Sequence, residues 1–278
     1  MGTAATDIMG NGSIGTFSIA SGAKLGVTSA DGITTSGATG NIQSGGTRTY
    51  NTGANYIYNG TSAQVTGNGL TQGTPAALTI NNAAGVRLSA ATTISGLLTM
   101  ANGTLDMSNT NLTVGSLTGS GNITNSTGTA GARTLAIGSD DTTPAAYSGI
   151  ISNGTASSVA VTKTGAGRLT FTNANTYTGL TTITGGELRL NPTSSSITFP
   201  SQVVLNGGTL GTSGINAGTT ITFSSALNLN ANSIISLDAA SHNLMFADSH
   251  LTGWSGTTLT ISGWGSTGGH VFFGNSAT

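Results

Sequence analysis

Apolar side chains occupy every second position at both ends of residues 164–190, and small turn-forming residues lie between these two runs. Leu169 and Phe171 alternate with polar residues in the first run, and Leu188 and Leu190 do so in the second. Alternation with a period of two is typical of half-buried β-strands, and clusters of Gly and Asn are typical of turns. We therefore expect strand, turn and strand across this segment.

A shorter unit of the same kind recurs along the chain: a strand, a tight corner and a second strand. Its copies are LTMANGTLDM at 98–107, TTITGGELRL at 181–190, VVLNGGTLGT at 203–212 and, more loosely, FSIASGAKLGV at 17–27. Asn-Gly and Gly-Gly pairs supply the positive φ that such corners need. Single units cannot bury their apolar face, so we expect them to stack as coils. Coils of about 20 to 25 residues would number roughly 11 to 14 and extend over roughly 50–70 Å.

The segment 164–190 also closely resembles the autotransporter-associated β-strand repeat, or passenger-associated transport repeat. The matching residues are Thr164, Gly165, Gly167, Leu169, Thr170, Phe171, the run NTYTG at 175–179, Thr181, Ile183, Gly186 and Leu188. Proteins with this repeat are long, secreted or surface-displayed bacterial chains folded as parallel β-helices. The resemblance covers about a tenth of the chain. It implies a fold and a location, and it carries no catalytic residues.

We predict an all-β fold, a right-handed parallel β-helix (β-solenoid), that forms one domain over residues 1–278. Residues 1–90 are expected to be Gly-rich N-terminal coils, and residues 91–212 the regular repeat coils. Residues 213–278 would supply the C-terminal coils and a β cap that folds back, with Trp254 and Trp264 packed over the last coil. No window shows the 3.6-residue apolar period of a helix.

Composition sets further limits on function. Of 278 residues, 44 are Gly, none is Cys and only 5% are charged, with a formal net charge of −1. Such a composition can indicate disorder, but the apolar fraction of 36% and its regular alternation favour a folded β protein.

Lys and Arg are too sparse for nucleic-acid binding, and no apolar run is long enough for a transmembrane helix. The first residues lack the features of a signal peptide. With the resemblance, an extracellular or bacterial cell-surface location is expected.

Catalytic chemistry has little support in the sequence. Some β-helix proteins are polysaccharide lyases or hydrolases, and glycoside hydrolysis needs two carboxylates that flank the bond. Asp140 and Asp141 are the one adjacent acidic pair, and their surroundings predict a turn. Glu187 and Arg189 should face outward on one strand, and Arg168 on a neighbouring coil should pair with Glu187. We predict no catalytic residues and no enzyme activity.

Metal and cofactor sites are not predicted either. His242, His250 and His270 are separated by eight and twenty residues, a spacing that matches no compact set of metal ligands. Asp238 and Asp248 lie near them in the sequence, but polar residues of a terminal coil explain both equally well.

Four aromatic residues form a candidate interaction surface: Tyr56, Tyr58, Trp254 and Trp264. If exposed, Tyr56 and Tyr58 would give a stacking platform for sugar rings or a protein partner. If buried, they would cover an apolar coil, and this second interpretation is favoured. The abundance of Asn and Thr also predicts ladders of identical side chains on stacked coils.

The function best supported by the sequence is structural: a bacterial extracellular repeat protein that acts as a stiff spacer or as a filament or matrix subunit. Both ends of a solenoid are open strand edges, and residues 1–17 contain only Asp7 as a charge. We therefore expect a homo-oligomer formed by end-to-end or strand-exchange contacts. An adhesin that binds polysaccharide or a host surface through exposed aromatic residues is the alternative, and a β-helix lyase or hydrolase is less well supported.

Overall fold

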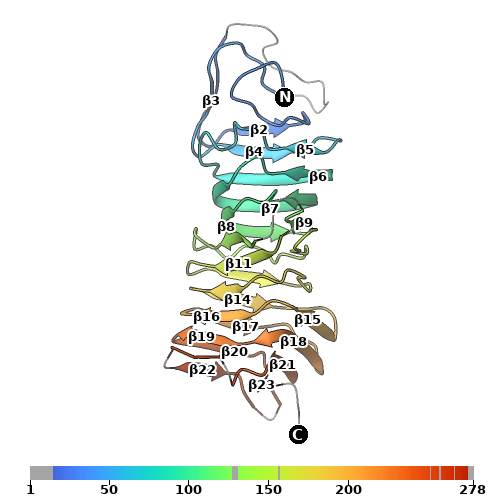
Figure 1. The fold of residues 1–278 in the computed structure, drawn as a ribbon, viewed down its shortest axis with the longest axis vertical. Helices are drawn as coiled ribbons and strands as arrows, with labels where there is room; N and C mark the ends of the chain where they lie inside the picture. Colours follow the sequence, from blue (N-terminus) through green and yellow to red (C-terminus); the bar gives the residue numbers. More distant parts are fainter. Residues whose placement is uncertain are drawn as a thin grey trace.

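The chain folds into a parallel β-solenoid of about nine turns (Figure 1). The computed structural model describes residues 15–126, 131–155, 157–250, 252–256, 258–265 and 267–274. Every regular element in these ranges is a β-strand, and every strand pair is parallel, as in the expected β-helix. Successive coils stack along the long axis, with the first coils at one end and the last at the other.

One long sheet runs through most of the solenoid. Its path of ten strands is β2 (Lys24–Val27), β4 (Asn55–Tyr58), β6 (Ala77–Arg87), β7 (Thr92–Asp106), β8 (Leu112–Gly119), β10 (Arg133–Ile137), β11 (Val159–Lys163), β13 (Thr181–Ile183), β16 (Val203–Asn206) and β19 (Asn228–Ala231). Two short strands, β5 (Gln64–Val65) and β9 (Asn122–Thr124), pair with it at the side.

Three smaller sheets complete the coils. Near the N-terminus β1 (Phe17–Ile19) pairs with β3 (Arg48–Tyr50). The second sheet contains β12 (Arg168–Phe171), β14 (Glu187–Leu190), β17 (Thr209–Thr212), β20 (Ser233–Ser236) and β22 (Leu259–Ser262). The third contains β15 (Ser196–Phe199), β18 (Thr219–Ala226), β21 (His242–Ala247) and β23 (Gly269–Phe273).

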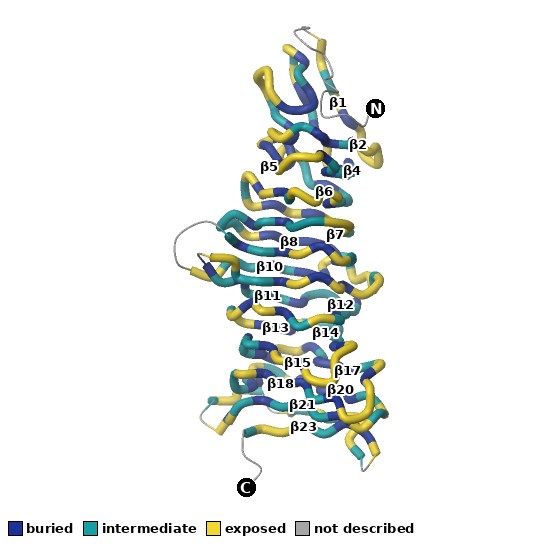
Figure 2. The backbone as a smooth tube through the Cα atoms, turned by 90° about the vertical axis from the view of Figure 1, so that its right-hand side faces the viewer, coloured by how far each residue is buried: buried dark blue, intermediate teal, exposed yellow. Residues whose placement is uncertain are grey.

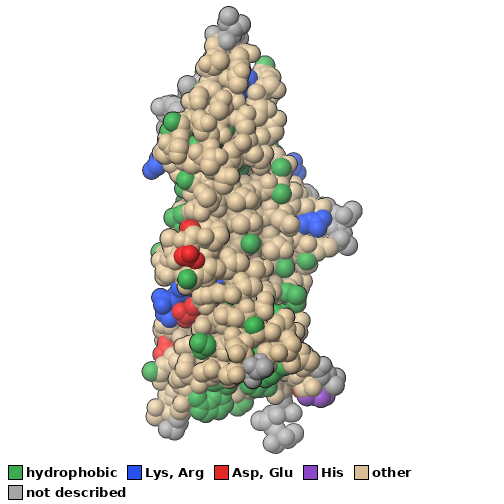
Figure 3. Space-filling view, turned by 90° about the vertical axis from the view of Figure 1, so that its left-hand side faces the viewer, with side chains coloured by type: hydrophobic (Ala, Val, Ile, Leu, Met, Phe, Trp, Pro, Cys, Tyr) green, Lys and Arg blue, Asp and Glu red, His purple; other side chains and the backbone are tan. Residues whose placement is uncertain are grey.

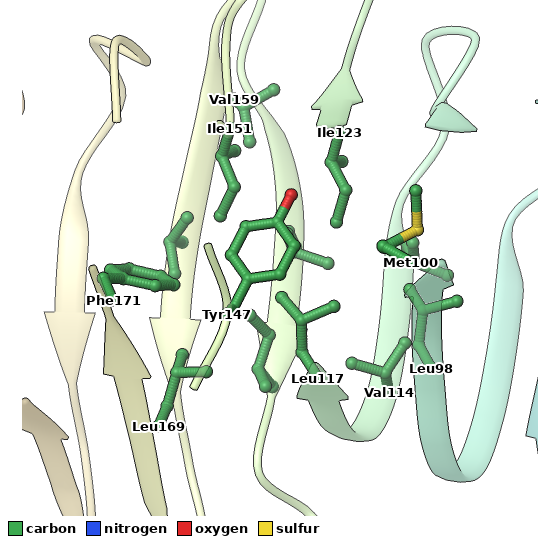
Figure 4. Close-up of a cluster of buried hydrophobic side chains, with 14 of the residues drawn as sticks. Leu98, Met100, Val114, Leu117, Ile123, Tyr147, Ile151, Val159, Leu169 and Phe171 are labelled. Carbon is green, nitrogen blue, oxygen red and sulfur yellow. The ribbon is translucent and has the colours of Figure 1, made fainter. Parts of the chain in front are cut away.

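Buried residues alternate with less buried ones along most strands (Figure 2), and the buried hydrophobic residues form one continuous core. In β11 the burial alternates strictly, and the buried positions begin with Val159 and Val161. Because the register places equivalent residues above one another, Leu78 pairs with Leu98 and Leu98 with Leu117. Figure 4 shows how residues of several successive coils, among them Tyr147 and Phe171, fill the interior. The core is thus a stack of layers of side chains, and each layer packs against the layers of the coils above and below it.

The clearest ladder of identical side chains is aromatic. Phe199, Phe223, Phe246 and Phe273 stack with ring centroids 5.1, 5.1 and 5.8 Å apart and interplanar angles of 20°, 7° and 12°. These separations match the repeat of a parallel sheet, because each ring is carried by the strand above the previous one. The Thr ladders that the sequence pattern predicted are also present, since the register aligns Thr79, Thr99 and Thr118. The phenylalanine ladder, which is buried except at Phe273, was not expected.

Coil length varies more than the sequence indicated. The register advances by 20 residues from Leu78 to Leu98 but by 31 from Leu25 to Tyr56. Longer connections therefore reduce the number of turns to about nine, fewer than the 11 to 14 expected. The C-terminal strands also do not fold back as a cap, since β22 and β23 continue their sheets in parallel.

A loop, residues 34–47, lies at the N-terminal end of the solenoid (Figure 1), and we call it the cap loop. Its Ile42 is fully buried, and its Asn41 Oδ1 accepts hydrogen bonds from the backbone N–H groups of Thr28 and Ser29, both at 2.8 Å. The buried Arg48 guanidinium donates to the Thr34 carbonyl at 3.1 Å and to the Ser44 carbonyl at 2.9 Å. A loop at this end was not expected from the sequence of residues 1–17, of which residues 1–14 lie outside the described part.

Glycines at the corners permit the coils to approach closely. Gly165 has a φ of 65°, and a Cβ at this position would lie 1.8 Å from the Gly138 carbonyl oxygen of the preceding coil. Gly22 has a similar φ of 77°, but a Cβ there would meet nothing within 4 Å. Alanine substitutions at the two positions therefore distinguish the cost of a left-handed backbone from the cost of blocking a close contact between coils.

We predict that Gly165→Ala lowers the free energy of unfolding by about 1–3 kcal/mol more than Gly22→Ala does, because the added methyl group forces two backbones apart. Gly22→Ala should cost about 1–2 kcal/mol, the penalty for a left-handed alanine. Urea unfolding followed by circular dichroism measures both. Equal losses in the two variants would show that close coil contact at this corner is unimportant for stability.

Candidate interaction surface

The tyrosines proposed for an interaction surface lie inside the solenoid. Tyr56 and Tyr58 are 2% and 0% exposed, and the hydroxyl group of Tyr58 donates to the Thr66 carbonyl at 2.6 Å. Tyr50 packs edge-on against Tyr56 with ring centroids 6.5 Å apart. Burial raises the pKa of all three phenols, that of Tyr50 to about 12 although the nearby Arg48 lowers it. Tyr56 and Tyr58 therefore fill the first coils, as the favoured interpretation of the sequence had it, and they do not form the exposed platform that was the alternative.

The two tryptophans, in contrast, are exposed at the C-terminal end. Trp254 is 41% and Trp264 is 54% exposed. The indole N–H of Trp254 donates to the Leu227 carbonyl at 3.1 Å, and its ring meets Phe273 edge-on at 5.9 Å. Trp264 packs edge-on against His270 at 5.7 Å. These residues stay a candidate surface, because their rings are fixed by the last coil yet keep one side open to solvent.

Asp140 and Asp141 lie in a turn, as the sequence indicated, and both support the backbone. Asp140 accepts hydrogen bonds from the Ser116 hydroxyl at 2.7 Å and from the Thr142 N–H at 3.0 Å. Partial burial raises the pKa of Asp140, but these hydrogen bonds outweigh it and the pKa is lowered. Asp141 accepts from the Ala166 N–H of the next coil at 2.7 Å. Both carboxylates therefore have structural partners on a neighbouring coil, Asp140 on the preceding one and Asp141 on the next.

The predicted ion pair between coils is present. Arg168 on β12 and Glu187 on β14 are paired in register, and their charged atoms lie 2.8 Å apart. Arg189, two residues along β14, contacts the same carboxylate at 2.8 Å. Partial burial raises the pKa of Glu187, but hydrogen bonds and charge from Arg189 and Arg168 lower it below its usual value. One carboxylate thus joins two adjacent coils on the outer surface.

Lys163 is a buried charge that the sequence reasoning missed. It is 1% exposed and occupies the inward row, in register with Ile137 and Ile183. Its ammonium group donates to the carbonyl oxygens of Thr164 and, at 3.1 Å, of Gly165. Burial lowers the pKa of Lys163, and the charges of Asp141 and Asp140 oppose this effect. The alternation that buries Val159 and Val161 also places residue 163 inside the solenoid. The sequence pattern could therefore have predicted the burial of Lys163.

The histidines do not form a metal site. His242 is buried, and its ring nitrogens lie 2.9 Å from the Thr212 hydroxyl and 2.7 Å from the Ala240 carbonyl. His250 is exposed and pairs with Asp248. Across the described residues, no group of three or more His, Asp or Glu side chains could hold a metal ion.

A shallow groove of about 530 Å³ lies on the side of the solenoid between β5 and β9. Arg87 and Asp106 are its charged residues, and Thr124 and Ser126 also line it. Both carboxylate oxygens of Asp106 accept hydrogen bonds from Ser126. The groove therefore contains one carboxylate with local partners, whereas hydrolysis of a glycosidic bond uses two.

Comparison with known proteins agrees with the repeat seen in the sequence. Residues 161–190 match the family model described as passenger-associated-transport-repeat. In the structure this segment runs from within β11 to the end of β14, which is one complete coil and the beginning of the next. Comparisons with curated proteins and with solved structures gave no match.

The match covers 30 of the 278 residues, so it identifies a repeat within the chain and not the chain as a whole. The chain contains an autotransporter-associated repeat within a β-solenoid, and this repeat is a structural one that is not known as enzymatic. The family suggests a secreted or surface protein. In the described part of the chain, no helix is long and apolar enough to span a membrane.

We predict that Glu187→Gln lowers the free energy of unfolding at neutral pH by at most about 1 kcal/mol, because the ion pairs are partly exposed. The folded-state pKa is below the ordinary 4.5. The stabilisation is therefore present above pH 4.5 and lost as the pH falls through the folded-state value. Urea unfolding of both proteins from neutral to acidic pH should show the difference disappear in acid. A difference that is constant over this range would contradict the assigned ion pairs.

Proposed function

We propose that this chain is a stiff spacer in a secreted or surface-displayed bacterial protein. The observation that carries the proposal is the unbroken sheet from β2 to β19, in which ten strands pair in parallel. Nine steps at about 4.8 Å give this sheet a length of roughly 43 Å. Because the apolar core is continuous along the same axis, bending the rod would require coils to separate and expose buried side chains.

The chemistry of the outer surface supports a passive role. Of the charged side chains, Asp140, Asp141, Arg168, Glu187 and Arg189 have partners that hold coils or turns together. The groove contains a single carboxylate. Thr, Ser, Asn and Gly supply most of the remaining surface, which keeps a rod soluble with few charges.

An adhesin that binds polysaccharide through exposed aromatic residues has weaker support. Two of its four candidate residues, Tyr56 and Tyr58, are buried. Trp254 and Trp264 remain exposed, but they lie at the end of the solenoid rather than along its side. A β-helix lyase or hydrolase has less support still, since no pair of free carboxylates faces a groove in the described residues.

Stiffness can be measured directly because the chain contains no cysteine. We predict that spin labels on Ser36→Cys, in the cap loop, and on Ser262→Cys, in β22, give one narrow distance distribution by pulsed electron paramagnetic resonance. The doubly labelled protein is diluted with unlabelled protein, so that only distances within one chain are recorded. As a control, labels placed at the ends of a Gly/Ser linker of equal length should give a broad distribution. A broad distribution for the solenoid would overturn the spacer proposal.

A further inference from the structure

The groove on the side of the solenoid is lined by outward-facing residues from successive coils. Strand β5, the last residues of β6 and β7, and β9 lie next to one another at the side of the long sheet (Figure 1). Their register places four residues in one outward column: Val65, Arg87, Asp106 and Thr124. Neighbouring strands are about 4.8 Å apart, so each side chain of this column lies beside the next. The groove therefore belongs to the regular stack of coils.

Arg87 is an exposed cation without a partner on a surface that has few charges. Figure 3 shows one face of the solenoid, on which charged side chains are sparse. The side chains of the other arginines each hold a backbone carbonyl or a carboxylate; these are Arg48, Arg133, Arg168 and Arg189. The guanidinium of Arg87 makes no hydrogen bond or ion pair with any residue that the structure describes. Its N–H donors are therefore free for a ligand in the groove that Arg87 lines.

Asp106 is the neighbour of Arg87 in register, yet it does not neutralise this arginine. The arginine and glutamate that are in register on β12 and β14 form an ion pair at 2.8 Å. The Asp106 carboxylate instead accepts hydrogen bonds from the Ser108 N–H at 2.8 Å, from the Ser126 N–H at 3.0 Å and from the Ser126 hydroxyl. These bonds hold the carboxylate toward its own turn and the next coil. Because a carboxylate has about four acceptor positions, Asp106 can accept one further hydrogen bond.

The rest of the lining offers a hydroxyl group and a patch of small side chains. Thr104 lies two residues before Asp106 on the same face of β7, and its hydroxyl has no hydrogen-bond partner among the described residues. Ala63, Ala84 and Gly85 also line the groove, and they leave room because their side chains are small. The volume of about 530 Å³ lies in the range of small-molecule sites, about 300–1,000 Å³.

These groups match a ligand that has one negative charge and several hydroxyl groups. A single guanidinium beside a carboxylate suits a carboxylate ligand better than a phosphate group, which carries about −1.5 to −2 charges at neutral pH. An acidic peptide carries the same charge as a carboxylated sugar. However, β6 and β7 are hydrogen-bonded on both sides, so a peptide would find no free strand edge there and would gain no backbone pairing. A sugar needs no such edge.

We propose that this groove binds a uronate unit of an acidic polysaccharide. The Arg87 guanidinium binds the carboxylate of the sugar through two N–H donors, the geometry in which arginine recognises carboxylates best. Asp106 accepts a hydrogen bond from one sugar hydroxyl, and Thr104 bonds to another. The C–H groups of the ring pack against Ala84. The site uses none of the exposed aromatic residues, and it goes beyond the spacer role without depending on it.

Calorimetric titration with carboxylated oligosaccharides tests whether the charge is recognised. The probes are hexamers of galacturonate, glucuronate, mannuronate and guluronate, each with its methyl ester as an uncharged control. At least one acid should bind, and its ester should bind about tenfold more weakly or not at all, because a hydrogen bond between charged groups is lost. No binding by any of the acids, or equal binding of acid and ester, would overturn the proposal. A glutamate hexamer that binds as tightly as the best sugar would overturn it too and would assign the groove to acidic peptides.

Substitutions locate the binding in the groove. Arg87→Gln should weaken binding of the best acid by about tenfold or more. Lys24→Gln is the matched control, because Lys24 is another exposed cation and lies outside the groove lining; this variant should bind normally. Thr104→Val removes only a hydroxyl and should weaken binding by about 3- to 10-fold. Equal losses in the Arg87 and Lys24 variants would reveal unspecific attraction to the whole chain and overturn the site.

A steric variant tests the same groove without a change of charge. Ala84→Phe places a large side chain in the groove and should abolish binding. Ala84 and Arg87 are exposed, so their substitution leaves the core intact, and circular dichroism shows that each variant is folded. A folded Ala84→Phe protein with normal affinity would contradict the groove as the binding site. The distance between spin labels on Ser36→Cys and Ser262→Cys does not depend on the sugar, so failure of this site and failure of the spacer proposal are distinguishable.

Discussion

Each coil of this protein is held in place by the coils on either side of it, because all strand pairs join different coils. A strand such as β11 has its backbone partners on β10 and β13, and its inward side chains meet those of the same neighbours. Neither the hydrogen bonds nor the apolar contacts of a coil are complete without the next one. The continuous core, the aligned side-chain ladders and the importance of the two ends all follow from this dependence.

Stacking also restricts which residues can occupy the corners and the inward rows. At the corner of Gly165 two backbones come close enough to exclude a Cβ. Most of the charged side chains described above lie where backbone groups or a neighbouring coil supply hydrogen-bond or ion-pair partners. In the inward row, Lys163 reaches carbonyl groups at a corner. On the outer surface, Glu187 contacts arginines of its own and the preceding coil. The scarcity of charge in the sequence is consistent with a fold whose polar groups are satisfied chiefly by strand pairing and turns.

The ends of a repeat protein require a separate solution, since terminal coils lack one neighbour. Here the cap loop lies at the N-terminal end, and the buried Arg48 of β3 donates hydrogen bonds to carbonyl groups of this loop. This end is therefore held by contacts from a side chain to the backbone as well as by strand pairing.

The sequence by itself determined the repeating unit. Alternation around Leu169 and Leu188 identified strands, Gly clusters identified corners, and the ion pair between Arg168 and Glu187 followed from stacking coils of similar length. These features are local or repeat at a regular interval, so periodicity reveals them. Only the tertiary structure decided the number of turns, the burial of Tyr56 and Tyr58, the loop at the N-terminal end and the exposure of Trp254 and Trp264. Each of these depends on which segment lies over a given coil, and irregular connections such as the cap loop determine that without leaving a periodic signal in the sequence.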